Sequence, residues 1–481
     1  MKNNYFADRF HKIRKSSSYT QKQIGEYLGI SNRAVSNWEN GISYPSTDNL
    51  IRLSKLFNVR PDYFYSDGML GYIDGRYQPV DMESLRELYR IGRGPSSSHT
   101  IGPERACIYF AKKNHFADSF SAVLFGSLAR TGKGHGTDVV IKKTLAPKPC
   151  EVQFDFGETD LSHPNTFILK AYKNKVLVDQ VTVYSIGGGR ILIDGQDIFR
   201  AKSSYSLHTF SEIANYCKEN NLRLWQYAEQ NEDANFRDYM FTVWAQMKRS
   251  IQNGLNDEGI LPGGLGVHKK AKQLISLEHI DETPETRENR LVSAYAFAVG
   301  EQNAAGETII TAPTCGAAGV VPAVLFYQQQ KRGYSDDQIV NALETAGVIG
   351  NLIKTNGSIS GAECGCQAEI GSACAMAAAS LGELFGLSFD KIEYAAEISI
   401  EHHLGLTCDP ICGLVQIPCI ERNAVAAMRA INAVNIASFL SDTRKISFDN
   451  IVGVMKKTGL DISNRYKETA EGGLATIEVA K

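Results

Sequence analysis

The chain has 481 residues, of which 43% are hydrophobic, 22% charged and 9% aromatic. This balance excludes a disordered, collagen-like or small disulfide-stapled protein, and the length predicts about three domains. The most apolar stretch, 424–440, is interrupted by Arg429, Asn432 and Asn435, so no segment reaches the ~18 residues that span a bilayer. The residues from Lys2 onward lack the apolar core of a signal peptide, so we expect a cytoplasmic protein with no membrane partner.

The net charge of −2 is unevenly distributed. Residues 1–66 carry ten Lys or Arg and five Asp or Glu, a balance of +5, whereas the remaining residues carry 41 against 48, a balance of −7. A basic segment on an acidic body suggests that only the first 66 residues meet a polyanion. Chance variation over a short segment is the alternative.

Two short helices joined by a tight turn are predicted inside the basic segment. The first opens with a capping box formed by Thr20 and Gln23 and ends near Leu28. The second covers 32–39 and is capped by Ser31. Two helices in this arrangement are typical of helix-turn-helix geometry.

Residues 5–65 resemble the phage-repressor-like helix-turn-helix family, which implies double-stranded DNA as a partner. The resemblance places Asn32, Arg33 and Asn37 in the major groove, where Asn and Arg can contact base edges. Gln21 would reach a phosphate. The alternative is that these polar side chains face solvent in a protein–protein adaptor. Because such DNA readers usually act as dimers, we expect a homodimer.

The remainder of the chain reads as a linker followed by two larger regions. Alternating apolar and polar residues predict strands in the first of these: Ala122–Phe125, Thr166–Tyr172, Val176–Val183 and Ile191–Ile193. From about residue 236 onward, β-rich runs give way to helical spacing. We therefore predict a multidomain protein with a small all-α helix-turn-helix domain, an α+β middle domain and a mostly α-helical C-terminal domain. The predicted boundaries are 1–66, a linker over 67–80, 81–235 and 236–481.

Seven of the ten cysteines lie between residues 315 and 419. In a cytosolic chain, such clustering suggests metal or redox chemistry, although burial is the simpler explanation for any single cysteine. Cys366, Cys408 and Cys419 are close to Gly or Pro and are expected on loops or helix ends, whereas Cys374 looks like helix core. Zinc-finger spacings are missing. Iron–sulfur clusters take thiolates from distant segments, so the spacing of the cysteines alone neither requires nor excludes such a cluster.

Nine segments together resemble one family, the bacterial iron–sulfur L-serine dehydratases, across about residues 81–475. They are Gly94–Ala106, Phe125–Asp138, His163–Asn165, Leu261–Gly264, Glu301–Gly306, Thr311–Gly319, Ser358–Gln367, Glu401–Asn423 and Tyr466–Gly473. The resemblance implies that L-serine is converted to pyruvate and ammonia. It also implies that Cys366, Cys408 and Cys419 hold a [4Fe-4S] cluster, whose open iron would act as a Lewis acid on the serine hydroxyl.

The resemblance also singles out candidates for proton transfer. A base must remove the Cα proton, and His99 and His135 both lie inside matched segments. Asp138 could orient His135. Which histidine is the base stays open at this point.

Substrate binding requires donors for a carboxylate. Three hydroxyl side chains precede a helix that starts with Gly102-Pro103: Ser97, Ser98 and Thr100. Asn165 could hydrogen-bond the substrate. Arg422, three residues after Cys419, could meet the carboxylate, or it could pair with Glu421 or Glu401.

Two departures from the family pattern bear on these assignments. Some relatives have a C-terminal cysteine, whereas none follows Cys419 here, and Cys364 and Cys412 add sulfurs near the predicted ligands. The leading hypothesis is a serine dehydratase whose DNA-binding head controls its own expression. The alternatives are a non-catalytic serine- or redox-sensing transcriptional regulator, or an enzyme whose head is an assembly module.

Overall fold

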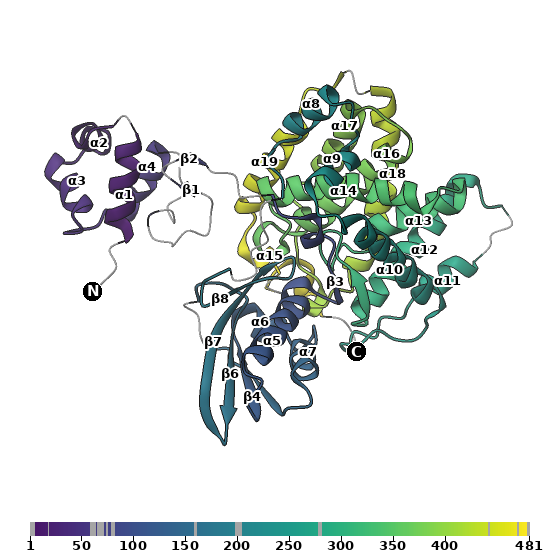
Figure 1. Cartoon of the computed structure of the whole chain (residues 1–481), viewed down its shortest axis with the longest axis horizontal. Coiled ribbons are helices and arrows are strands. Elements are labelled where there is room, and N and C mark those ends of the chain that lie inside the picture. The colour runs from purple at the N-terminus through teal and green to yellow at the C-terminus, as the bar shows by residue number, and fades with distance from the viewer. Residues whose placement is uncertain are drawn as a thin grey trace. The chain divides into compact units, whose positions relative to one another are not determined.

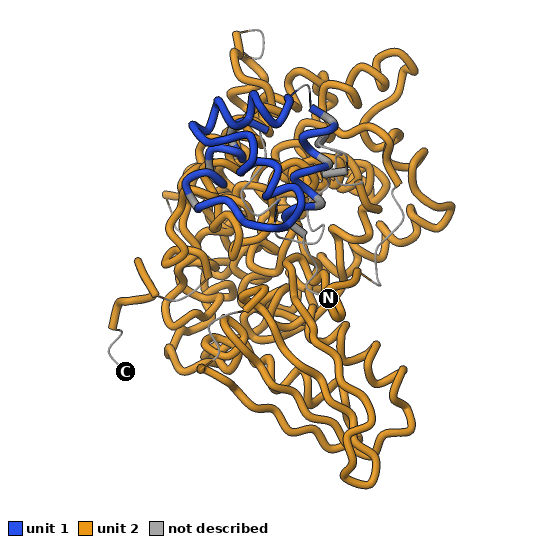
Figure 2. The backbone as a smooth tube through the Cα atoms, turned by 90° about the vertical axis from the view of Figure 1, so that its left-hand side faces the viewer, with its two compact units in different colours: residues 1–80 blue, residues 81–481 orange. Residues whose placement is uncertain are grey.

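The computed structural model describes residues 5–17, 19–57, 64, 72–73, 76–77, 82–157, 161–197, 204–277, 281–440, 443–468 and 471–478. The chain divides into two compact units, Met1–Val80 and Asp81–Lys481, coloured separately in Figure 2.

The first unit is a small helical bundle (Figure 1). Its elements are α1 (Tyr5–Ser16), α2 (Gln21–Leu28), α3 (Asn32–Glu39), α4 (Thr47–Leu56) and the paired two-residue strands β1 (Tyr72–Ile73) and β2 (Arg76–Tyr77). Residues 67–71, 74–75 and 78–80 of the predicted linker lie outside the described residues.

Local sequence determines the two motif helices. The Thr20–Gln23 capping box is present, and Gly29 ends α2 in the left-handed region with φ +73°. Ser31 accepts a hydrogen bond from the Ala34 N–H at the start of α3. A Cβ on Gly25 would lie 2.9 Å from the Ile30 carbonyl oxygen, so glycine allows the turn to close tightly. The predicted helix-turn-helix is confirmed.

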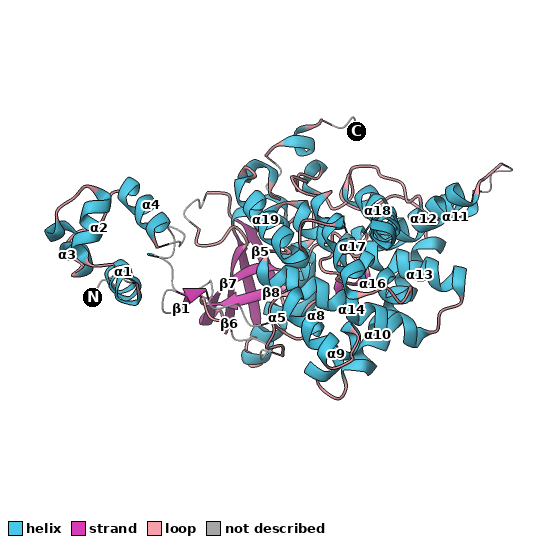
Figure 3. Cartoon of the chain, turned by 90° about the horizontal axis from the view of Figure 1, so that it is seen from above, coloured by secondary structure: helices cyan, strands magenta, loops and turns pink. Residues whose placement is uncertain are grey.

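The second unit contains a five-stranded sheet in the order β5-β4-β6-β7-β8 (Figures 1 and 3). Its strands are β4 (Ser119–Leu124), β5 (Cys150–Phe154), β6 (Thr166–Lys173), β7 (Val176–Gly187) and β8 (Arg190–Ile193). β4 and β5 are parallel, and the other pairs are antiparallel. The four predicted strands are confirmed, and β5 is an additional strand.

Two helices, α5 (Gly102–Lys113) and α7 (Thr137–Leu145), contribute Phe110 and Ile141 to the core that they share with the sheet. Pro103 is in the first turn of α5, where its missing N–H costs nothing. The short α6 (Gly126–Thr131) precedes α7, and a π-helical turn (Ser97–Ile101) leads directly into α5.

Most other described elements of this unit are helices. Its helices are α8 (Phe210–Glu219), α9 (Leu224–Asn231), α10 (Phe236–Asn256), α11 (Ala271–Ser276), α12 (Pro284–Ala304), α13 (Val320–Arg332), α14 (Asp336–Asn356), α15 (Gly361–Cys364), α16 (Ser372–Leu384), α17 (Phe389–Glu401), α18 (Cys419–Leu440) and α19 (Phe448–Asp461). Two short strands form a separate pair: β9 (Thr308–Ile310) pairs antiparallel with β3 (Ile91–Arg93) and so joins segments more than 200 residues apart. The predicted mostly α-helical C-terminal region is confirmed, and β9 is a short strand that the sequence did not predict.

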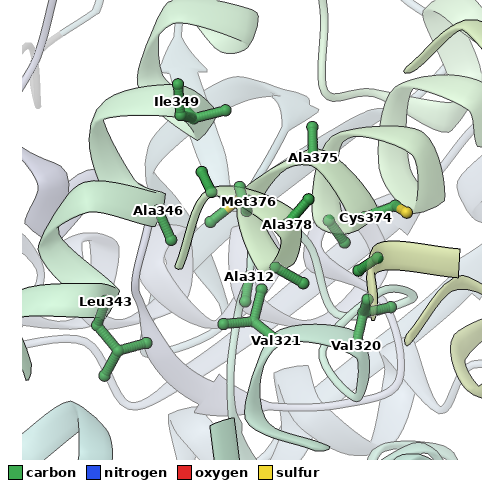
Figure 4. Packing of buried hydrophobic residues seen from close by; sticks show 14 of the residues in the cluster. Ala312, Val320, Val321, Leu343, Ala346, Ile349, Cys374, Ala375, Met376 and Ala378 are labelled. Atoms are coloured by element: carbon green, nitrogen blue, oxygen red, sulfur yellow. The ribbon is translucent and has the colours of Figure 1, made fainter. Parts of the chain in front are cut away.

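The helical core is built around α14 and α16, as Figure 4 shows. Ala346 and Ile349 of α14 and Ala375 and Met376 of α16 are fully buried. Small side chains allow the helices to approach closely: a Cβ on Gly350 would meet the Met376 sulfur at 2.6 Å. Within the described part of the chain, no helix combines the length and hydropathy that crossing a bilayer requires.

Candidate active site

A cleft lies where the π-helical turn, the β7–β8 turn and the loops of the helical region meet. Its empty space, including the part that opens to solvent, is about 610 Å³. The residues that line it include Ser96, Ser97, Ser98, His135, Gly187, Gly188, Thr314, Ser360, Cys366, Glu369, Cys408, Cys419 and Glu468.

Three cysteines from separate segments meet at this cleft. Cys366 follows α15, Cys408 lies in the loop after α17, and Cys419 is the first residue of α18. All three are at least 93% buried. The sulfurs of Cys366 and Cys408 and a carboxylate oxygen of Glu369 all lie within 4.8 Å of one another. Glu369 Oε2 is 3.9 Å from each of the two sulfurs.

Two of the thiols at this cleft, those of Cys408 and Cys419, resist ionisation. The hydrogen bond with Cys366, and then burial, raise the pKa of Cys408 well above its ordinary value. Burial, and then the nearby Cys366, do the same for the pKa of Cys419. A cation that binds here would therefore release protons from these thiols, so its affinity would rise with pH.

The donor set fits an iron–sulfur group. Thiolates are the usual ligands of such clusters, and here three buried sulfurs from distant segments line one cleft. Of the ten cysteines, all within the described residues, only these three line it. Cys364 packs against Gly459, and burial raises its pKa to about 11, whereas Cys412 is exposed.

Two histidines stack face to face beside the cleft, with His99 and His135 ring centroids 4.4 Å apart at an interplanar angle of 30°. His99 is fully buried. Its Nδ1 lies 3.0 Å from Ser98 Oγ, and its Nε2 lies 2.8 Å from Thr131 Oγ1. Hydroxyl groups therefore occupy both of its ring nitrogens.

His135 is different because, among the described residues, only its Nδ1 has a hydrogen-bond partner. Its Nδ1 lies 2.9 Å from the Thr131 carbonyl oxygen, and because a carbonyl only accepts, Nδ1 carries the hydrogen. The neutral ring then has a lone pair on Nε2. Burial lowers the pKa of His135 to about 4, so the ring is neutral at pH 7. Thr131 provides the orienting contact expected of Asp138, which is half-buried in the first turn of α7.

The predicted substrate-binding hydroxyls divide into two groups. Ser97 and Ser98 line the cleft, and Ser97 Oγ accepts a hydrogen bond from the Cys315 N–H at 3.0 Å. Thr100 is fully buried, and its hydroxyl lies 2.8 Å from the Arg93 carbonyl and 2.5 Å from the Ser96 carbonyl. Thr100 therefore stabilises the π-helical turn.

Asn165 and Arg422 are not among the residues that line the cleft. The Asn165 Oδ1 is buried and has no hydrogen-bond partner among the described residues. Arg422 donates from Nη1 to the Thr407 carbonyl at 2.7 Å, and its Nη2 is 3.8 Å from Asp409 Oδ1. Burial lowers the pKa of Arg422, but the neighbouring Cys366 and Cys419 sulfurs raise it overall.

Sequence reasoning missed two acidic residues of the cleft, Glu369 and Glu468. Glu468 lies in the C-terminal segment, with a backbone φ of +60° that is uncommon for a non-glycine residue. Burial, and then the nearby Glu369, raise its pKa to about 8. The matched segment Tyr466–Gly473 was the only signal in the sequence that pointed to it.

Comparison with known proteins identifies the family. A family model described as "Serine dehydratase alpha chain" matches residues 200–475, and "Serine dehydratase beta chain" matches 84–151. The chain belongs to the serine dehydratase family. The family similarity extends over nearly the whole length of its relatives: "L-serine dehydratase" of Streptomyces coelicolor and "L-serine dehydratase 1" of Escherichia coli are each 39% identical, covering 82% of this chain and 98% and 99% of theirs. "L-serine dehydratase" of Helicobacter pylori is 36% identical, covering 82% and 98%.

In this serine dehydratase chain a helix-turn-helix model also matches residues 10–64, outside both dehydratase segments. Asn32 and Arg33 are exposed on α3, and Asn37 is half-buried. The Gln21 amide donates to Glu39 Oε2 at 2.5 Å, so this side chain is engaged within the head. Its phosphate contact stays a prediction.

Proposed function

We propose that this chain is an iron–sulfur-dependent L-serine ammonia-lyase that converts L-serine to pyruvate and ammonia. The observation that carries the proposal is the convergence of Cys366, Cys408 and Cys419 at one cleft that also exposes a neutral imidazole, His135. The names of the relatives support L-serine as the substrate.

In the proposed enzyme the three cysteines hold a [4Fe-4S] cluster. When bound, such a group supplies a Lewis acid that helps the substrate hydroxyl to leave, because three protein ligands leave one of four irons open. The buried thiols would lose their protons on binding it. This chain's other residues must then bind the amino acid and move its Cα proton.

His135 is the proposed general base. Its Nε2 lone pair is available because Nδ1 is bound to the Thr131 carbonyl, and its side chain lines the cleft. His99 stacks on His135 and is held by two hydroxyls, which suits a positioning role for this second imidazole. Asp138 remains a proposed contributor to the same orientation.

Ser97 and Ser98 are the proposed donors to the substrate carboxylate, together with N–H groups of the turn they occupy. Thr100 would act indirectly, by holding that turn. The unpartnered Asn165 Oδ1 is consistent with a contact to a bound molecule. A carboxylate role for Arg422 would require its guanidinium to leave the Thr407 carbonyl.

Loss of the Cα proton and of the hydroxyl gives an aminoacrylate, which water converts to pyruvate and ammonia. The test is pyruvate formation from L-serine by protein reconstituted with iron and sulfide without oxygen. The cluster-free protein is the control, and we expect turnover only after reconstitution. Protein that carries iron and sulfide but turns over neither L-serine nor L-threonine would contradict the proposal.

We further propose that residues 1–66 bind double-stranded DNA as part of a homodimer and regulate the chain's own expression. The exposed Asn32 and Arg33 on α3 support this. A gel shift with the chain's own promoter region should detect salt-sensitive binding. Absence of any DNA affinity would favour an assembly role for the head.

We also propose a cytoplasmic location. Ten free cysteines support a reducing compartment, the cytoplasm.

A non-catalytic serine or redox sensor is the second candidate, and the helix-turn-helix match is the observation that favours it. Replacement of Cys408 by serine separates the two. An enzyme loses pyruvate formation, whereas a serine sensor that needs no cluster keeps its serine-dependent DNA response.

A further inference from the structure

The acidic groups of the cleft differ in what surrounds them. Glu369 and Glu468 both line it, and no lysine or arginine is among the described residues that do. Glu369 lies against the cysteine sulfurs, with Oε2 3.9 Å from both Cys366 and Cys408. It therefore belongs to the metal-binding side of the cleft. Glu468 is the remaining acidic side chain that a substrate can meet.

Backbone hydrogen bonds hold Glu468 next to Cys408, one of the three cysteines of the cleft. Its N–H donates to the Cys408 carbonyl at 2.6 Å, and the Cys408 N–H donates to the Tyr466 carbonyl at 2.8 Å. Cys408 and Lys467 thereby form a short parallel bridge. Glu468 also adopts the left-handed conformation, at φ +60°. Strain of this kind persists where the surrounding structure determines it, as it often does in binding sites.

The Glu468 side chain reaches the opposite wall of the cleft. It shares a hydrogen bond with Ser98, and its Oε1 lies 3.9 Å from His99 Nδ1. The Ser127 hydroxyl donates to its backbone carbonyl at 3.3 Å. The carboxyl group is therefore held between the cysteine sulfurs and the paired imidazoles.

The substrate of the proposed function carries three polar groups. In the proposed function its hydroxyl lies next to Cys366, Cys408 and Cys419. Its carboxylate is bound by the serine hydroxyls and N–H groups of the π-helical turn. Its ammonium group needs an acceptor, because an unpaired charge in a buried cleft is costly. The raised pKa of Glu468, about 8, favours its protonated form at pH 7, and an ammonium group beside it would lower that pKa and favour the carboxylate.

We propose that Glu468 binds the α-ammonium group of the substrate and thereby selects amino acids over the corresponding hydroxy acids. This inference rests on the proposed function. It assigns Glu468 to substrate binding, whereas His135 removes the Cα proton and the substrate hydroxyl lies next to Cys366, Cys408 and Cys419.

The experiment compares two dead-end ligands of the reconstituted enzyme, L-alanine and L-lactate. They differ only in an ammonium group against a hydroxyl, and neither has the leaving hydroxyl on its β-carbon. Their inhibition constants against L-serine are measured, and calorimetry gives their dissociation constants independently of turnover. We expect the wild type to prefer L-alanine at least about tenfold, because a charge-assisted contact is stronger than a neutral one.

In Glu468→Gln, we expect the preference for L-alanine over L-lactate to fall towards one. The KM for L-serine should rise at least about thirtyfold, the usual effect of removing one partner of a buried charge pair. Glu468→Asp should give an intermediate preference, because it keeps the charge but retracts it. Glu471→Gln is the matched control, since Glu471 is exposed, pairs with Arg130 and does not line the cleft.

A merely structural role for Glu468 predicts that both inhibitors weaken equally, so an unchanged preference in Glu468→Gln overturns the proposal. If that variant does not fold, Glu468→Asp decides by the same criterion. A wild type that does not discriminate between the ligands also overturns it. If the wild type does not turn over L-serine at all, the proposed function itself fails.

Discussion

Burial of His135 should make the stability of the cluster-free protein depend on pH in a measurable way. Burial lowers the pKa of this side chain to about 4 in the folded protein, from an ordinary value of 6.5. Between these two pH values the unfolded chain binds more protons than the folded chain, so stability falls as pH falls from 6.5 towards 4. A difference of about 2.5 pH units corresponds to a maximum loss of about 3 kcal/mol. At pH 5.0, the same linkage gives a loss of about 2 kcal/mol relative to pH 7.5.

The perturbation that isolates this effect is His135→Gln, which removes the titrating group. Loss of the stacking on His99 and of the hydrogen bond to Thr131 lowers stability at both pH values, so it cancels when the pH difference is taken. The free energy of unfolding is measured by pulse proteolysis in urea at pH 7.5 and 5.0. His115→Gln is the control, because His115 is exposed.

We expect the wild type and His115→Gln to lose about 2 kcal/mol more than His135→Gln between pH 7.5 and 5.0. Equal losses in the wild type and His135→Gln would refute the reasoning. The imidazole would then titrate as it does in water, and its assignment as a buried neutral base would fail with it.

Three further predictions follow from other contacts. Thr131→Val removes the hydroxyl 2.8 Å from His99 Nε2 but keeps the backbone carbonyl that orients His135. We expect kcat to fall about tenfold at unchanged iron content, because His99 loses one of its hydrogen bonds. An unchanged kcat would exclude a role for His99. Gly254→Ala would place a Cβ 2.3 Å from the Ala298 carbonyl oxygen, where α10 packs on α12. This clash should lower the free energy of unfolding by about 2–3 kcal/mol. An unchanged urea midpoint would contradict that packing. Arg33→Ala should weaken DNA binding by about tenfold while leaving pyruvate formation unchanged, and a gel shift equal to that of the wild type would remove Arg33 from the interface.

The helix-turn-helix could be predicted from sequence because its signals are local. Thr20, Gln23 and Ser31 act on backbone groups three residues away, and the capping contacts are in place. The long strands of the sheet were equally accessible, since alternation reports one buried face. β9 was not, because three residues are too few to display a period and its partner, β3, lies far away in the sequence.

The site was predictable by residue type rather than by contact. The three cysteines stood out because they lie close to Gly or Pro within matched segments, and the fold brings them to one cleft. Apart from its place in the matched segment Tyr466–Gly473, no sequence pattern distinguishes Glu468 from exposed glutamates, because its burial depends on the pairing of the C-terminal segment with Cys408. The contact between His135 and the Thr131 carbonyl could not be predicted either, because every residue has a backbone carbonyl and the sequence does not mark the one that binds His135.

The central claim is that Cys366, Cys408 and Cys419 together hold an iron–sulfur cluster that the reaction needs. The most direct measurement is iron and acid-labile sulfide per chain, together with pyruvate formation, on oxygen-free preparations of the wild type, Cys408→Ser and Cys374→Ala. Cys374 is the matched control, because it is fully buried in α16 and does not line the cleft. We predict ~4 iron and ~4 sulfide with activity in the wild type and Cys374→Ala, and loss of both cluster and activity in Cys408→Ser. Wild-type iron content and full activity in Cys408→Ser would contradict the account.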